Sequence, residues 1–358
     1  MVTRLRPTTL AEVRDAVRDG PAQLLVSGAG TAAGWGGVPA PADAVLDVTA
    51  LDGVLSYEPS DMTVTVRAGT PLAALQDVLA GKGQQVALDA GRVGRGATVG
   101  GLIATGDAGP ARHSYGTLRD SVIGITVVLA DGTVARSGGQ VIKNVAGYDL
   151  AKPFHGSLGT LGVIAEATLR LYPLPAATRT VAVECDPAAG FELAGRMVAD
   201  SLEPAAVEWY DGRLLARFEG TSAGVARRAA GFEETDPVVW REIGDLAVGG
   251  PGDTVLRAGT SPSLSPWVAD RVRALDAAVS SSVGAGVHTI RLRDVPASVV
   301  SALRDEITDR GGSVSMLRRG TEVPAWGRPP ASVALMRAVK QRFDPSNRFG
   351  AGRFAPWF

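Results

Sequence analysis

Short apolar runs separated by glycine-rich turns dominate the first half of the chain. Such runs are typical of β-strands, and they lie at 23–26, 45–48, 64–66 and 122–129. The dipeptide Asp131-Gly132, which follows the last run, is typical of a tight hairpin leading into a strand at 134–136. Hairpins outnumber parallel crossovers, and the pattern predicts an α+β fold.

Two short helices are predicted among these strands. Thr9 opens a capping-box pattern, and Gly20 is a natural stop for the helix that follows. Thr70 is expected to cap a second helix, with Pro71 at its first helical position and Gly81 beyond its end.

Beyond Pro173 the pattern changes to strands that alternate with helices. The predicted elements are strands at 180–184, 286–293 and 313–317, a hairpin over 207–218 that turns at Asp211-Gly212, and helices at 191–200 and 297–309. Two β-α-β patterns of this kind predict a sheet with helices on one face. An amphipathic helix over 331–343 and an arginine- and glycine-rich tail follow.

Length and composition fit a globular protein of two domains. The chain has 358 residues, 45% of them hydrophobic and 20% charged. Its net charge is −1 and its lysines and arginines are dispersed, which excludes a nucleic-acid-binding protein. The single cysteine, Cys185, excludes a disulfide framework and an iron–sulfur or other cysteine-ligated metal site built by this chain alone. No apolar run approaches the ~20 residues of a membrane span and no signal peptide is recognised, so we expect no transmembrane segment and a cytoplasmic location.

Glycine is the unusual residue of this composition, at 45 of 358 residues. The glycines gather in three stretches between strand-like runs, which is typical of structured loops rather than linkers. Where glycines are this dense, the backbone approaches a ligand or another strand closely. Together the three stretches predict the site of a large phosphate-bearing cofactor.

The first stretch, Ser27-Gly-Ala-Gly-Thr31, directly follows a predicted strand. Main-chain N–H groups in such a turn form an anion-binding concavity, to which Thr31 adds a hydroxyl donor. Asp47 ends the next strand, where the ribose-binding acid of a dinucleotide fold would lie. The glycine spacing and the further glycines and prolines of 31–41 exclude the helix which that fold requires. A plain tight turn is the alternative for this stretch.

The second stretch runs from 94 to 106 and contains Thr98, the pair Gly100-Gly101, and Thr105. Paired glycines let a pyrophosphate lie against the main chain, and the two threonines can hydrogen-bond it. An ordinary loop with a Gly-Gly turn is the alternative.

The third stretch, 143–173, contains the run Gly-Ser-Leu-Gly-Thr-Leu-Gly and continues into an apolar strand. The main-chain N–H and C=O of Ile164 can meet a flat heterocycle there, while apolar side chains cover its face.

In this order the motifs resemble a known family. The strand followed by SGAGT, then ATVGGLIATGDAG at 97–109, then KNVAGYDL and GSLGTLGVI between 143 and 164, resemble the FAD-binding domain of the vanillyl-alcohol-oxidase (PCMH-type) superfamily. More narrowly, the chain is similar to the FAD-binding E subunits of bacterial glycolate oxidases. The segment 336–353, with Lys340 and Phe343-Asp344-Pro345, is similar to the closing segment of that group.

This resemblance implies the architecture. We expect a two-subdomain PCMH-type FAD-binding domain over 1–175 and a smaller α+β substrate or cap domain of antiparallel sheet and helices over 176–330. The C-terminal helix and tail over 331–358 are expected to return to the FAD domain.

The resemblance also implies the residues that contact the cofactor. The first two loops hold the FAD pyrophosphate, the end of the second lines the flavin side, and Ile164 meets the adenine. The full set is Ser27, Gly28, Ala29, Gly30, Thr31, Ala97, Thr98, Gly100, Gly101, Thr105, Gly106 and Ile164. Many relatives carry a histidine in the first loop that bonds covalently to the flavin. Since Ala29 and its neighbours offer none, FAD is expected to be non-covalent.

No catalytic set is recognisable, and the catalytic residues are unknown. Oxidation of a 2-hydroxy acid needs a base for the hydroxyl proton and cations for the carboxylate. None of the three histidines, His113, His155 and His288, stands beside another histidine or a carboxylate, so we expect no metal site. Tyr148 and His288 remain as candidates, and a structural role is the alternative for each. A structural role is favoured for Lys143. Arg112 and Arg119 could face a carboxylate or phosphate, but surface arginines are the commoner case.

Three functions follow from the resemblance. The first is the FAD-binding subunit of a glycolate oxidase-like complex, partnered by a second flavoprotein subunit and an iron–sulfur subunit, with a small 2-hydroxy acid as substrate. Its flavin accepts a hydride or relays electrons, and partners could bring the complex to a membrane. The second is a free-standing FAD-dependent alcohol or 2-hydroxy acid oxidoreductase. The third is a non-catalytic assembly subunit.

Overall fold

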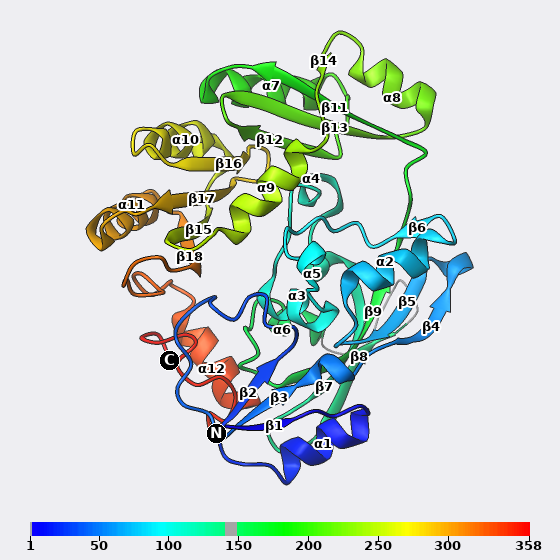
Figure 1. The fold of residues 1–358 in the computed structure, drawn as a ribbon, viewed down its shortest axis with the longest axis vertical. Helices are drawn as coiled ribbons and strands as arrows, with labels where there is room; N and C mark the ends of the chain where they lie inside the picture. Colours follow the sequence, from blue (N-terminus) through cyan, green and yellow to red (C-terminus); the bar gives the residue numbers. More distant parts are fainter. Residues whose placement is uncertain (1, 140–148) are drawn as a thin grey trace.

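The protein is represented by a computed structural model that describes residues 2–139 and 149–358. Its described part contains four β-sheets with helices packed against them (Figure 1). The predicted α+β fold is confirmed. Lys143 and Tyr148, which the sequence analysis singled out, lie outside the described residues.

A small parallel sheet begins the chain. Its order is β1 (Thr3–Leu5), β3 (Ala44–Asp47), β2 (Leu24–Ser27), and α1 (Leu10–Arg18) packs beside it. The Thr9 hydroxyl accepts a hydrogen bond from the Glu12 amide at 3.2 Å, which starts α1 where the sequence predicts. Val13 and Val17, one turn apart, are fully buried and hold the helix to the core.

A five-stranded antiparallel sheet follows. Its order is β4 (Val54–Glu58), β5 (Thr63–Arg67), β9 (Val163–Arg170), β7 (Val122–Val128), β8 (Val134–Gly138). The helices of this part of the chain are α2 (Leu72–Ala80), α3 (Val99–Thr105), α5 (Leu118–Ser121) and α6 (Ala151–Phe154). A separate two-stranded sheet pairs β6 (Gln84–Gln85) with β10 (Tyr172–Pro173). The predicted hairpin is confirmed, because Gly132 turns the chain at φ +85° between β7 and β8. The predicted cap of α2 is wrong by one residue: Pro71 is the N-cap, and the Thr70 hydroxyl instead accepts from the Gly53 amide at 3.0 Å.

An eight-stranded antiparallel sheet forms the second half, in the upper part of Figure 1. Its order is β14 (Glu233–Glu234), β11 (Ala177–Glu184), β13 (Arg213–Gly220), β12 (Ala206–Tyr210), β16 (Ala278–Ser282), β17 (Val287–Arg293), β15 (Asp253–Gly259), β18 (Ser313–Arg318). Asp211 and Gly212 both have positive φ, 48° and 76°, which is the geometry of the predicted hairpin between β12 and β13.

Helices cover both faces of this sheet. One face packs against α7 (Pro187–Ala199), α8 (Ser222–Ala229), α10 (Ser265–Arg273) and α11 (Ala297–Asp309). The opposite face receives α9 (Val239–Val248), whose Val239 and Ile243 pack against Leu215 of β13. The expectation of helices on one face alone is therefore wrong, because β13 places apolar side chains on both faces of the sheet.

The C-terminal segment returns to the first sheet, as predicted. The Leu24 amide donates to the carbonyl of Arg348, which follows α12 (Val333–Phe343), at 2.8 Å. The buried Lys340 ammonium donates to the Asp344 carboxylate at 2.6 Å and to the Thr160 carbonyl at 2.9 Å. This pairing satisfies a buried cation and holds the tail against the third glycine-rich stretch.

No helix in residues 2–139 or 149–358 is long and apolar enough to cross a membrane. The eight-stranded sheet begins at Ala177 and its last strand ends at Arg318, while the division into domains at 175/176 and 330/331 stays a prediction.

Two glycines in van der Waals contact set the spacing between the halves of the molecule. A Cβ built on Gly91 would lie 2.2 Å from the Gly244 carbonyl oxygen of α9, far inside contact distance. The segment just before the second glycine-rich stretch therefore meets α9 at a point where no side chain fits.

Gly91→Ala is expected to lower the free energy of unfolding by about 1–3 kcal/mol, because the added methyl overpacks this contact. Urea unfolding measures the change. Gly94→Ala, three residues on, is the matched control, since a Cβ there meets no atom within 4 Å. Equal stabilities for the two variants would contradict the assigned contact.

Candidate functional site

The first glycine-rich loop leaves β2 with a row of free main-chain donors. The N–H groups from Gly28 to Ala32 have no acceptor among the described residues. Gly30 has a φ of +73° and open space where a Cβ would stand. Consecutive free amides around a left-handed residue form an anion-binding concavity, which is what the sequence predicts for this turn.

The second loop packs directly against the first. Thr98 caps α3 by accepting from the Gly101 amide at 3.2 Å. A Cβ on Gly28 would lie 2.5 Å from the Thr98 hydroxyl oxygen, and one on Gly100 would lie 2.7 Å from the Ala68 Cβ. Glycine is required at both positions because the two loops and β5's end approach one another this closely.

These loops and β9 enclose one cavity of about 930 Å³, its open mouth included. All the predicted cofactor residues except Gly106 line it: Ser27, Gly28, Ala29, Gly30, Thr31, Ala97, Thr98, Gly100, Gly101, Thr105 and Ile164. Gly106 ends α3 with a φ of +63° and faces the His155 ring, so it turns the chain beside the cavity. Three segments far apart in the sequence thus meet at one site.

Sequence reasoning missed four charged or aromatic residues of the cavity wall, which are Trp35, Arg92, Asp107 and Arg353. Trp35 is 5% exposed, and its ring lies 4.5 Å from the Arg92 guanidinium carbon and 5.4 Å from that of Arg257. Arg353 donates to the Ala33 and Trp35 carbonyls at 2.7 and 2.8 Å. The fourth residue, Asp107, follows the second loop.

Asp107 is 1% exposed and lies between two arginines. Its carboxylate is 3.5 Å from Arg92 Nη1 and 2.9 Å from Arg257 Nη2. Burial lowers the pKa of Arg92, while the nearby Asp107 carboxylate raises it. The trio links the cavity wall to β15 of the eight-stranded sheet.

The cavity fits a ligand that carries phosphate groups and flat rings. Besides the free amides, the buried Trp35 Nε1 and Arg353 Nε have no hydrogen-bond partner among the described residues. Buried donors without partners are rare in proteins, and donors that face a cavity are satisfied when a ligand binds. The rest of the cavity wall consists of glycine main chain and apolar side chains, against which flat rings can pack.

The histidines lie apart from this cavity. His288 of β17 is fully buried, with Nε2 2.9 Å from the Thr260 hydroxyl and Nδ1 2.9 Å from the Ser281 hydroxyl. Burial lowers its pKa to about 4. Both ring nitrogens are engaged, which is the arrangement of a structural histidine. His155 and His113 are partly buried, and no group of three or more metal-ligating side chains occurs in the described part of the chain.

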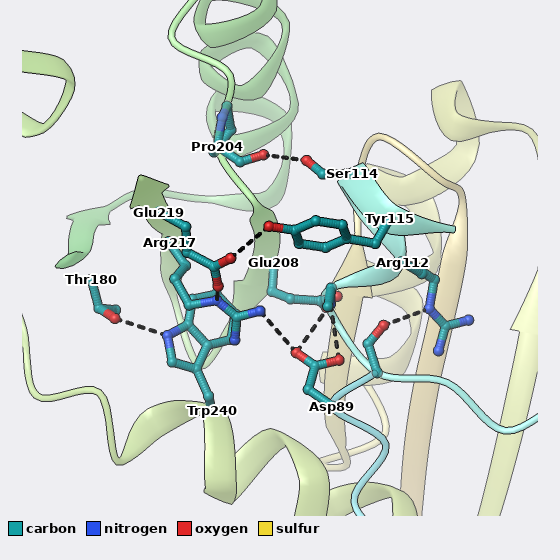
Figure 2. A network of polar contacts seen from close by, with 12 residues as sticks. Asp89, Arg112, Ser114, Tyr115, Thr180, Pro204, Glu208, Arg217, Glu219 and Trp240 are labelled. Carbon is teal, nitrogen blue, oxygen red and sulfur yellow. Dashed lines mark hydrogen bonds and ion pairs between the residues drawn. The ribbon is translucent and has the colours of Figure 1, made fainter. Parts of the chain in front are cut away.

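A second polar cluster lies where the loops meet the eight-stranded sheet (Figure 2). Arg217 Nη2 donates to the Asp89 carboxylate at 3.1 Å, and Asp89 accepts from the Ala111 amide at 3.0 Å. The Tyr115 hydroxyl donates to Glu219 at 2.9 Å, and burial together with this hydrogen bond raises the pKa of Tyr115 to about 12. These contacts clamp α4 (Arg112–Tyr115) to β13.

Glu208 of β12 is the buried acid of this cluster. It is 3% exposed, and its carboxylate accepts hydrogen bonds from the hydroxyls of Ser280, at 2.5 Å, and Ser282. No cation lies within 4 Å of it among the described residues. Burial raises the pKa of Glu208 to about 7, and the serine hydrogen bonds and the more distant Arg112 oppose this rise. Nothing in the sequence marks this glutamate, because its serines lie 72 and 74 residues away.

Comparison with known proteins supports the cofactor. Residues 3–138 match the family described as FAD binding domain. Glycolate oxidase subunit GlcE of Escherichia coli (strain K12) is 34% identical over 200 residues, which are 55% of this chain and 57% of that protein. Glycolate oxidase subunit GlcD of Bacillus subtilis (strain 168) is 34% identical over 189 residues, 52% of this chain and 40% of that protein.

Two further similarities extend the picture. A mitochondrial D-lactate dehydrogenase [cytochrome] 1 of Saccharomyces cerevisiae is 36% identical over 136 residues, 38% of this chain and 23% of that protein. A solved structure of alkyldihydroxyacetonephosphate synthase has a TM-score of 0.72 at 16% identity, covering 97% of this chain and 75% of that one, which shows a shared fold. The chain spans little more than half the length of the first curated relative and less of the others. The predicted resemblance and the predicted FAD cofactor are confirmed.

Gly28→Ala is expected to weaken FAD binding tenfold or more, which corresponds to about 1.4 kcal/mol, because the new methyl displaces the hydroxyl that caps α3. Fluorescence titration of the apoprotein with FAD measures the dissociation constant. Gly34→Ala is the control, since a Cβ there meets no atom within 4 Å and the residue lies outside the cavity wall. A Gly28→Ala protein that binds FAD as tightly as the control contradicts the assignment.

Glu208→Gln is expected to become more stable relative to the parent protein as pH rises. The folded protein holds the Glu208 proton up to about pH 7, whereas the unfolded chain loses it near 4.5, so this group weakens folding progressively between these values and fully above them. Between pH 4.5 and 8 the difference in unfolding free energy shifts toward the variant by up to about 3 kcal/mol.

Urea unfolding of both proteins at several pH values gives this difference. The contributions of His155 and His288 cancel in it, because both proteins contain these histidines. Glu192→Gln on the exposed side of α7 is the matched control, measured at the same pH values. A difference for Glu208→Gln that stays flat with pH would show that the buried carboxyl titrates normally.

Proposed function

We propose that this chain, which carries an FAD binding domain, is the FAD-binding subunit of a 2-hydroxy acid dehydrogenase complex of the glycolate oxidase kind. The observation that carries the proposal is the single cavity built by three separate glycine-rich segments, with free amides and unpartnered donors in its wall. FAD, when bound, supplies an acceptor for a hydride from the substrate carbon.

The residues of the cavity have distinct roles in this proposal. The amides from Gly28 to Thr31 and the hydroxyl of Thr98 hold the pyrophosphate, and the main chain at Ile164 receives the adenine. Trp35 Nε1 and Arg353 Nε donate to polar atoms of the cofactor. No histidine, cysteine or tyrosine among the described residues lines the cavity, and we infer that FAD is held without a covalent bond.

Partners complete the proposed complex. Relatives whose names call them glycolate oxidase subunits support a multi-subunit assembly. We infer a second flavoprotein chain and an iron–sulfur chain as partners, and a small 2-hydroxy acid as the substrate. A cytoplasmic location stays a prediction.

Anaerobic titration of the purified yellow chain with glycolate and D-lactate tests the function. Bleaching of the flavin absorbance is expected with at least one of these acids, either by the isolated chain or after the partner chains are added. A colourless protein that takes up no FAD overturns the proposal. A flavoprotein that neither acid reduces in the presence of its partners overturns the assigned substrate class.

A further inference from the structure

The C-terminal tail, residues 349–358, is hydrogen-bonded to the segment that follows the first glycine-rich loop. The Gly37 amide donates to the Arg353 carbonyl at 2.7 Å. The Ala40 amide donates to the Ala351 carbonyl at 2.6 Å. Main-chain hydrogen bonds therefore dock the tail on this segment.

The same segment also contacts the eight-stranded sheet. The Gly36 amide donates to the Met316 carbonyl of β18, the edge strand, at 3.3 Å. The Trp35 side chain packs against Val255 of β15 and Leu317 of β18. The segment that the tail holds is thus also the one that joins the cofactor cavity wall to the sheet.

Aromatic packing adds to the docking of the tail. The Phe354 ring stacks on the Trp326 ring, with 5.2 Å between centroids and an interplanar angle of 10°. The Trp357 ring lies 4.8 Å from that of Trp326, whose Nε1 donates to the Arg353 carbonyl at 2.8 Å. These contacts are apolar or neutral, and they favour docking with or without a ligand.

One side chain of the tail opposes docking. Arg353 is 9% exposed and lines the cofactor cavity, yet no carboxylate lies within 4 Å of its guanidinium in the described part of the chain. Burial lowers the pKa of Arg353, and the neighbouring cation of Arg319 lowers it further. Docking the tail therefore takes a cation out of water without supplying an anion, which costs free energy.

The cofactor cavity offers a place for that anion. The row of free amides from Gly28 to Ala32 ends directly before Ala33, whose carbonyl accepts from Arg353 Nη1 at 2.7 Å. An anion bound by these amides thus lies beside the guanidinium, and the unpartnered Nε of Arg353 is a donor for it. The loop and the tail supply complementary parts of one anion site.

We propose that a diphosphate held by the first glycine-rich loop is the counter-ion of Arg353, and that cofactor binding thereby stabilises the docked tail. Since the coupling is reciprocal, a docked tail strengthens cofactor binding by the same factor. The inference uses the cofactor of the proposed function, and it depends neither on the substrate nor on the partner chains.

Hydrogen exchange of the full-length chain, followed by mass spectrometry with and without saturating FAD, tests the proposal. Relative to α8, which lies outside the cavity wall, amides of the tail and of 34–41 are expected to exchange at least about tenfold more slowly with FAD. Riboflavin, which has no phosphate, is expected to leave their exchange unchanged.

Arg353→Gln removes the charge and is expected to reduce the slowing by saturating FAD to less than about threefold. The matched control is Arg342→Gln on the exposed side of α12, which keeps the response of the parent. Arg353→Lys keeps the charge and is expected to retain part of the response, which covers the case in which Arg353→Gln fails to fold.

The proposal is overturned if FAD leaves tail exchange in the parent unchanged, if riboflavin slows it equally, or if Arg353→Gln responds to FAD as the parent does. Flavin absorbance of the same samples, recorded with the acids that test the function, separates the two failures. If an acid bleaches the flavin but the tail does not respond to FAD, the function stands and the docking falls. If the tail responds but no acid reduces the flavin even with the partner chains, the docking stands and the redox function falls.

Discussion

The buried carboxylate of Asp107 is the constraint on which the wall of the cofactor cavity depends. It holds Arg92, which stacks on Trp35 in the cofactor cavity wall, and Arg257, which belongs to the eight-stranded sheet. Burying one carboxylate among two guanidinium groups is favourable only while all three stay together, because loss of the anion leaves uncompensated cations. This one carboxylate thereby contributes to fixing the sheet against the glycine loops.

The junction between the two halves uses the same chemistry a second time. Asp89 joins Arg217 of β13 to the Ala111 amide, while Gly91 and Gly244 touch without side chains between them. Polar pairs fix the lateral position and the glycine contact fixes the separation. Such a junction allows one relative position of the two halves, whereas an apolar interface allows several positions of similar free energy.

Local signals account for what the sequence could predict. The glycine-rich loops, the hairpins at Asp131-Gly132 and Asp211-Gly212, and the cap at Thr9 each depend on residues within a few positions of one another. Gly106 misses the cavity, although its neighbours Thr105 and Asp107 line it, because it faces the His155 ring. Trp35, Arg92 and Glu208 carry no local signal, since their partners lie far along the chain. The side of the sheet that α9 covers is likewise decided by packing on Leu215 and not by periodicity.

The return of the C-terminal tail has a consequence for how the protein is made. Arg353 lines the cofactor cavity and bonds to Ala33, a residue synthesised 320 positions earlier. At ribosomal rates of roughly 5–20 residues per second, the first loop emerges on the order of tens of seconds before the arginine that closes its wall. The wall of the cofactor cavity is therefore complete only once residue 353 has been synthesised and has packed against the first loop.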